Sequence, residues 1–117
     1  MIISDLIKKS KTGKIELMTD GLEIRDFINA KDVARAMILI MEKMPNNPIA
    51  IGSGKGIYIK KIAQLIAEKT GAKLIIGKEK AECRKRIMDV SDLKQLGFRQ
   101  KIGIIRGINE VLKWNSK

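Results

Sequence analysis

The chain has 117 residues, with 24 Lys and Arg against 13 Asp and Glu, so its formal net charge is +11. This length is enough for one hydrophobic core. The sequence contains neither an apolar run near the ~20 residues of a membrane span nor a signal-peptide pattern, which predicts a protein without membrane segments. The single cysteine, Cys83, excludes an internal disulfide and fits the reducing cytoplasm, where we expect the protein to reside. The positive charge favours anionic partners: nucleic acid, anionic lipid or phosphorylated small molecules.

The first half of the chain alternates short elements. We expect a helix over residues 4–11, a strand over 14–18, a turn at 19–21, an extended segment over 22–28 and a helix over 31–43. Ser4 and Asp5 suit the start of the first helix, and Asn29 suits the N-cap of the last. Residues 36–41 are apolar on every side of that helix. We therefore expect helix 31–43 to expose apolar surface, or to hide it in self-association or against a partner.

The second half continues the same pattern. We expect a strand over 49–51, a loop over 52–56, an extended segment over 57–59, a helix from there to Thr70, a strand over 73–77, a charged loop over 78–86, and helices over 92–96 and 104–114. Gly71 fits the position after a helix C-terminus. A stripe of Ile59, Ile62, Ala63 and Ile66 predicts the buried face of its helix. The predicted class is α/β: a single small mixed domain over residues 1–117, with alternating helices and short strands.

Motifs that would carry catalysis are missing from the sequence. The loop Gly52-Ser53-Gly54-Lys55-Gly56 matches neither the P-loop nor the dinucleotide fingerprint, so a tight turn between strands is the better interpretation. Short-chain oxidoreductases need a Tyr with a Lys four residues later, but the only tyrosine, Tyr58, is followed at that distance by Ile62. No histidine exists, and Glu23 and Asp26 suggest an ordinary surface pair of carboxylates. We predict no catalytic residue and no metal site.

Arg25 ends an extended segment beside a turn, where a guanidinium can form a bidentate contact with a diphosphate. A structural ion pair with Asp26 or Asp32 is the alternative. The residues alone leave both interpretations open.

Residues 25–36, Arg-Asp-Phe-Ile-Asn-Ala-Lys-Asp-Val-Ala-Arg-Ala, resemble the "RDF(I/V)-x-V-x-DVARA" segment of the extended short-chain dehydrogenase/reductase family. This is the NAD(P)-dependent nucleotide-sugar epimerase/dehydratase family, of the GDP-fucose synthase, dTDP-glucose 4,6-dehydratase and UDP-galactose 4-epimerase type. Further matches follow in order: the turn at 18–21, the strand and turn at 49–54 that resemble "Y-N-I-G-S-G", the helix at 62–71, the element at 88–98, and a closing helix with Gly107 and Trp114. Together they cover nearly the whole chain.

The resemblance implies the C-terminal, substrate-binding part of the family, without the N-terminal Rossmann half that carries the NAD(P) site and the Tyr-Lys pair. It implies that this chain binds no cofactor itself and is inactive alone. The family's "RDF" arginine contacts the diphosphate of the nucleotide-sugar, a role that falls on Arg25. A second basic residue comes from the loop over 78–86, where the family's pattern is not cleanly matched. The substrate-binding candidates there are Lys78, Lys80, Arg84 and Arg86.

Three functions follow from these observations. The first is a fragment or split subunit of a nucleotide-sugar epimerase or dehydratase, which binds the diphosphate of its ligand weakly. The second is a small basic module that binds nucleic acid or another polyanion, although no base-stacking aromatics or DNA-binding motif support it. The third is a non-catalytic remnant that docks on a separately encoded Rossmann domain.

Overall fold

The computed structural model describes residues 2–82 and 84–115. The elements of these residues are, in chain order, α1 (Ile2–Ser10), β1 (Lys14–Glu16), β2 (Ile24–Asp26), α2 (Ala30–Lys43), β3 (Gly56–Tyr58), α3 (Ile59–Thr70), β4 (Lys73–Ile75), β5 (Lys85–Arg86), α4 (Ser91–Gln95) and α5 (Ile104–Asn115). Helices and short strands alternate along the chain, so the predicted α/β class is confirmed.

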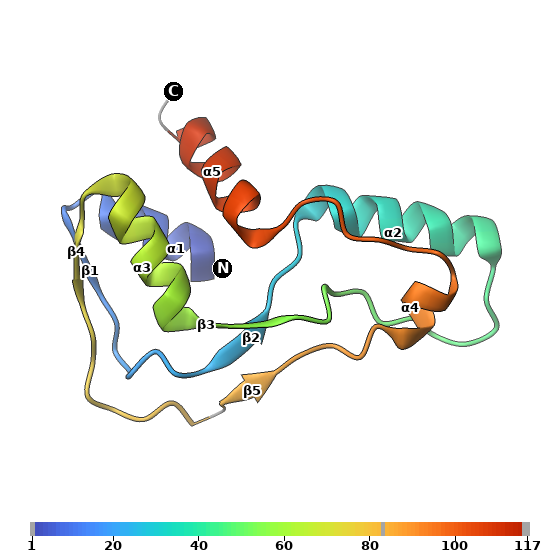
Figure 1. Cartoon of the computed structure of the whole chain (residues 1–117), viewed down its shortest axis with the longest axis horizontal. Helices are drawn as coiled ribbons and strands as arrows, with labels where there is room; N and C mark the ends of the chain where they lie inside the picture. The colour runs from blue at the N-terminus through green and yellow to red at the C-terminus, as the bar shows by residue number, and fades with distance from the viewer. Residues whose placement is uncertain (1, 83, 116–117) are drawn as a thin grey trace.

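The strands form two small sheets (Figure 1). In the first, β1 and β4 run parallel, with Lys14 opposite Lys73. In the second, β2 lies in the centre, antiparallel to β3 and parallel to β5. The second sheet therefore brings three segments that are distant in sequence onto one short platform around residues 24–26.

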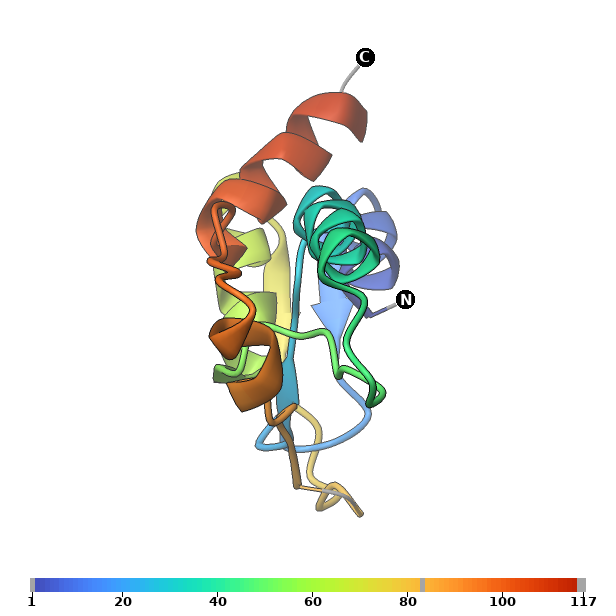
Figure 2. The same ribbon diagram turned by 90° about the vertical axis from the view of Figure 1, so that its right-hand side faces the viewer.

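Two hydrophobic clusters replace the single core that the chain length suggests. The first cluster joins α1, β1, α3 and α5 through residues that include Ile7, Ile15 and Ile62. The second joins α2, α4 and the following segment through Ala36, Leu93 and Phe98. The clusters lie toward opposite ends of the long axis in Figure 1, and Figure 2 shows α1 and α2 on one side of the molecule with α3 and α4 on the other. The central sheet connects these two ends.

Several local predictions are confirmed because their physical causes act within a few residues. The Asn29 side chain accepts a hydrogen bond from the Lys31 N–H at 2.9 Å and caps α2. Gly71, at φ 75°, ends α3 in the left-handed conformation. The stripe of α3 is buried at all four predicted positions. The predicted start of the first helix is wrong: α1 already includes Ile2 and Ile3, so Ser4 and Asp5 lie inside the helix.

The strand predictions are less accurate, because a strand requires a neighbour. Residues 49–51 form no strand, and among the described residues no backbone–backbone hydrogen bond joins residues 45–52 to another segment. Ile49 and Ile51 instead pack half-buried against the second cluster. Conversely, β5 lies inside the predicted charged loop, and Gly56 belongs to β3 because it pairs with Asp26.

The molecule is flat and extended, with dimensions of 47 × 36 × 16 Å. Its radius of gyration is 16.0 Å, against about 13 Å for a compact domain of this length. Much of α2 is uncovered: Met37, Ile38, Met41 and Met44 are 53, 56, 74 and 80% exposed. The predicted apolar surface on helix 31–43 is thus present. Within the described residues, none of the helices combines the length and apolarity needed to cross a membrane.

Candidate functional site

Two of the five predicted substrate-binding residues are neighbours on the second sheet. Arg25 in β2 is opposite Arg86 in the parallel strand β5. Side chains of directly opposed residues on adjacent strands point to the same face of a sheet, so both guanidinium groups project from one face. Arg25 is half-buried, and its Nη1 donates to the Ile24 carbonyl at 3.1 Å, while Arg86 is exposed. The sheet thus places two arginines next to each other, one half-buried and one exposed.

The other three predicted residues gather beside the turn that follows β1. Lys78 and Lys80 are exposed and flank Glu79, whose carbonyl accepts from the Asp20 N–H at 2.7 Å. Arg84 Nη2 lies 3.1 Å from Asp20 Oδ2 in an ion pair. The Leu22 N–H and then the Arg84 guanidinium hold the pKa of Asp20 below its ordinary value. The structure thus divides the five residues into a sheet pair and a turn group.

Asp26 connects three segments at the end of β2. Its Oδ1 accepts hydrogen bonds from the Ser53 N–H at 2.9 Å and the Ser53 hydroxyl at 2.5 Å. Its Oδ2 accepts from the Gly54 N–H at 2.8 Å and the Met88 N–H at 3.2 Å. The interpretation of this carboxylate as an ordinary surface group is wrong. Its partners lie 27 to 62 residues away in sequence, so only the fold reveals its role.

Asp32 has a comparable role on α2. Its side chain is fully buried, and its carboxylate accepts from the Lys101 N–H at 3.2 Å, the Ile102 N–H at 2.9 Å and Arg35 Nη1 at 2.5 Å. The Arg35 guanidinium also lies 5.2 Å from the centre of the Phe98 ring. Asp26 and Asp32 both belong to the segment 25–36, which was the strongest sequence signal, but the sequence assigned importance there to Arg25 alone.

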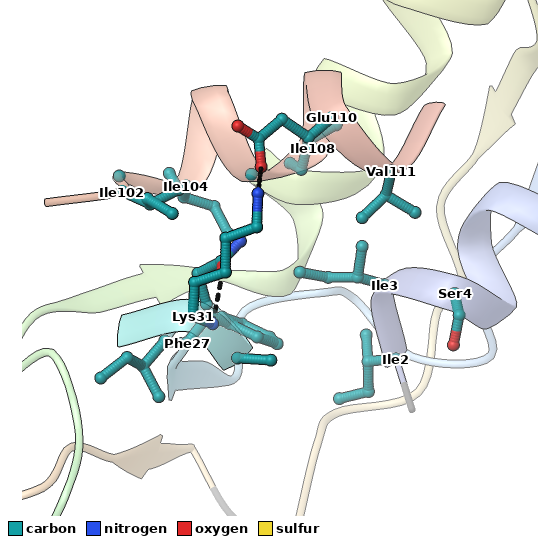
Figure 3. Close-up of a pocket in the computed structure, with 15 residues that line it drawn as sticks. Ile2, Ile3, Ser4, Phe27, Lys31, Ile102, Ile104, Ile108, Glu110 and Val111 are labelled. Carbon is teal, nitrogen blue, oxygen red and sulfur yellow. Dashed lines mark hydrogen bonds and ion pairs between the residues drawn. The ribbon is translucent and has the colours of Figure 1, made fainter. Parts of the chain in front are cut away.

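An apolar groove of about 390 Å³ lies between α1, the start of α2 and α5 (Figure 3). Ile3, Phe27, Ile104 and Val111 point into it, and an ion pair between Lys31 Nζ and Glu110 Oε2, at 3.7 Å, spans its side. None of the five predicted substrate-binding residues lines this groove. The groove and the sheet pair are therefore separate features, and the two charged side chains that line the groove, Lys31 and Glu110, form an ion pair with each other.

The loop over 52–56 does not have the structure of a dinucleotide fingerprint. The loop over 52–56 leads into β3, an antiparallel strand, whereas a dinucleotide fingerprint must open a helix whose N-terminus faces the pyrophosphate. Gly54 alone of its three glycines has a positive φ, at 72°, as a tight turn requires. Within residues 2–82 and 84–115, no cluster of three His, Cys, Asp or Glu could hold a metal ion.

Comparison with known proteins identifies relatives along the whole chain. Residues 1–52 match the sequence profile of the NAD dependent epimerase/dehydratase family. The dTDP-L-rhamnose 4-epimerase of Burkholderia thailandensis is 30% identical over an alignment of 119 positions that covers 97% of this chain and 32% of that protein. The GDP-L-fucose synthase 1 of Arabidopsis thaliana is 28% identical over an alignment of 104 positions that covers 83% of this chain and 31% of that protein. The chain spans about a third of the length of the curated relatives it matches.

Solved structures give the same result. The UDP-glucose 4-epimerase of Thermotoga maritima, solved with UDP-glucose, superimposes with a TM-score of 0.86 at 26% identity. The match covers 99% of this chain and 39% of that one. MoeE5, solved with UDP-glucuronic acid and NAD, gives a TM-score of 0.83 at 27% identity, over 99% of this chain and 41% of that one. Each matched structure therefore contains a large region that has no counterpart here.

Proposed function

From the established resemblance of this chain to part of the NAD-dependent nucleotide-sugar epimerase/dehydratase family, we propose that it binds the diphosphate of a nucleotide-sugar through Arg25 and Arg86. The observation that carries this proposal is the register of β2 and β5, which pairs these two residues on adjacent parallel strands. Adjacent strands lie about 4.8 Å apart, so two guanidinium groups can approach the two phosphates of one diphosphate.

The chemistry of the pair suits this ligand. An arginine contacts phosphate oxygens with two parallel, charge-assisted hydrogen bonds, each stronger than a neutral one. The turn group, Lys78, Lys80 and Arg84, adds positive potential along the approach to β5 and favours encounter with an anion. Among the relatives, the T. maritima structure was solved with UDP-glucose and the MoeE5 structures with UDP-sugars, which supports a nucleotide-sugar as the ligand here.

Calorimetric titration tests the proposal, with UDP-glucose, a GDP-sugar and a dTDP-sugar as probes. Arg25→Ala should weaken binding about 10- to 100-fold, because one charge-assisted contact contributes about 1.5–3 kcal/mol. Arg106→Ala is the matched control, because this substitution removes the same charge at a position on α5, where Arg106 forms an ion pair with Glu110. Equal losses in both variants, or a wild-type chain that binds duplex DNA more tightly than any nucleotide-sugar, would contradict the proposal and favour a polyanion module.

A second proposal concerns the apolar face of α2, here the exposed side chains of Met37, Ile38, Met41 and Met44. We propose that this face packs against the region that, in the relatives, lies outside the match with this chain, in the same polypeptide or a separate one. The chain exposes 8121 Å², about 1,700 Å² more than a folded monomer of 13.1 kDa is expected to expose. This excess exceeds the ~800 Å² that one partner contributes to a standard interface.

The segment 49–51 supports the same occupant, because its half-buried residues make no backbone–backbone hydrogen bond in the described structure and can extend a sheet. Sedimentation equilibrium tests the idea on a mixture of this chain with the part of the T. maritima enzyme that lies outside the match, which covers 39% of that enzyme. We expect a one-to-one complex that Ile38→Lys weakens. A stable homodimer of the chain alone that Ile38→Lys dissociates would instead establish self-association through α2, and absence of any complex would refute the proposal.

A further inference from the structure

The strand that carries Arg86 has little of its own to hold it in place. β5 contains only Lys85 and Arg86, and it joins the sheet beside a bond from the Ile24 N–H to the Arg84 carbonyl at 2.5 Å. The register of so short a strand is weakly specified by its ladder alone. The position of the Arg86 guanidinium relative to Arg25 must therefore depend on contacts outside the ladder.

Asp26 supplies such a contact. Its Oδ2 accepts from the backbone N–H of Met88, two residues beyond Arg86, and from that of Gly54. Consecutive side chains on a strand point to opposite faces, so Asp26 lies on the face away from Arg25. The carboxylate thus holds the segment after β5 against β2 on the face opposite Arg25. An anion bound on the arginine face would not contact this carboxylate.

Close packing around the carboxylate leaves these segments little freedom. A side-chain carbon at Gly52 would lie 2.7 Å from Met88 Cβ and 3.0 Å from Asp26 Oδ2. A side-chain carbon at Gly54 would lie 2.6 Å from Val90 Cγ2. The loop over 52–54 therefore approaches residues 88–90 closely, and glycine is needed there because any larger residue would separate the two segments.

We infer that Asp26 is a positioning residue, which holds Arg86 in register with Arg25 and thereby shapes the diphosphate site. This inference rests on the proposed function. It assigns to a negatively charged residue a favourable effect on the binding of an anion, which is the opposite of its direct electrostatic effect. Removal of its charge at unchanged geometry should tighten anion binding, because like charges repel.

Asp26→Asn separates the two effects. The amide keeps one acceptor oxygen and replaces the other with an NH2 group, so either the Ser53 N–H or the Gly54 and Met88 N–H groups lose their partner while the side-chain volume stays nearly the same. Glu79→Gln is the matched control, because it makes the same charge change at an exposed position between Lys78 and Lys80. The readouts are amide hydrogen exchange in the ligand-free chain and calorimetric affinity for inorganic pyrophosphate and UDP-glucose.

We expect Asp26→Asn to accelerate exchange of the Ser53 amide or of the Gly54 and Met88 amides, whichever lose their acceptor. We also expect it to weaken pyrophosphate binding about tenfold, the loss expected when the competent arrangement is populated about one tenth of the time. Glu79→Gln should bind as tightly as the wild type or more tightly. If Asp26→Asn unfolds the chain, Ser53→Ala, which removes the hydroxyl's bonds to Asp26 and to the Lys55 backbone but keeps the carboxylate, should weaken binding in the same direction.

Failure of the positioning role and failure of the proposed function give different results. If the wild type binds pyrophosphate and UDP-glucose but Asp26→Asn behaves like Glu79→Gln, or its amide exchange is unchanged, the positioning role is overturned and the proposed function stands. If the wild type binds neither probe, the proposed function fails, and the inference fails with it.

Discussion

Replacement of Asp32 by Ala is expected to separate α2 from the segment that crosses its N-terminal end. The carboxylate is fully buried and joins three donors: the backbone N–H groups of Lys101 and Ile102 and the Arg35 guanidinium. Alanine removes all three acceptor contacts at once. No other described side chain hydrogen-bonds to the Lys101 or Ile102 N–H, so these donors lose their partner when the carboxylate is removed.

The expected loss follows from the exposure of these donors. A buried donor without a partner costs about 1–3 kcal/mol, and this applies fully to Ile102, which is buried. Lys101 is exposed and the Arg35 side chain is 35% exposed, so water can replace part of their lost bonds. We therefore expect a total loss of about 2–4 kcal/mol, a large fraction of the ~5–15 kcal/mol that stabilises a typical domain.

Urea denaturation followed by circular dichroism measures this loss, and we expect the midpoint to fall by about 1–2 M. Asp92→Ala is the matched control, because Asp92 also occupies the first turn of a helix but is exposed. Its loss should stay within the ~0.3–1 kcal/mol of a helix-dipole contact. If the two variants lost equal stability, the three bonds to Asp32 would not hold α2 in place.

Three further predictions concern stability. Ile38→Lys, at an exposed site on α2, should change the unfolding free energy by less than about 0.5 kcal/mol, whereas Ile66→Lys in the first cluster should unfold the chain, as thermal melts will show. Gly77→Ala should lower the melting temperature, because a Cβ there would lie 2.5 Å from backbone atoms of the neighbouring strand segment, while Gly103→Ala, which meets no atom within 4 Å, should not. The pKa of Asp20 is lowered below 3.8 in the folded chain, so the stabilising contribution of its carboxylate should be present above that pH and lost on further acidification. Asp20→Asn should therefore be less stable than the wild type at pH 6, and its stability should approach that of the wild type below pH 3.8, as urea titrations at each pH will show.

Features with local causes could be predicted from the sequence. The cap at Asn29, the end of α3 at Gly71 and the buried stripe through Ile62 depend on residues within one or two helical turns. The apolar circumference of α2 also predicted its exposed surface, because a thin molecule can cover only one side of a helix.

Features that depend on distant partners were not predictable in this way. Residues 49–51 have the composition of a strand, but no neighbour in the described chain completes a ladder with them. β5 is too short and too charged to be recognised, and it forms because Arg86 meets Arg25 on a strand 61 residues earlier in the chain. Asp26 and Asp32 acquire their roles from backbone N–H groups up to 70 residues away, and such donors leave no mark in the sequence.

The most direct test of the central claim is an NMR titration that observes the arginine and lysine side chains, with UDP-glucose as the ligand. If the diphosphate lies between β2 and β5, the guanidinium resonances of Arg25 and Arg86 should shift together in one saturable process, and those of Arg99 and Arg106 should not. Shifts confined to Lys78, Lys80 and Arg84, or no saturable shift at Arg25 and Arg86, would contradict a nucleotide-sugar site on this sheet.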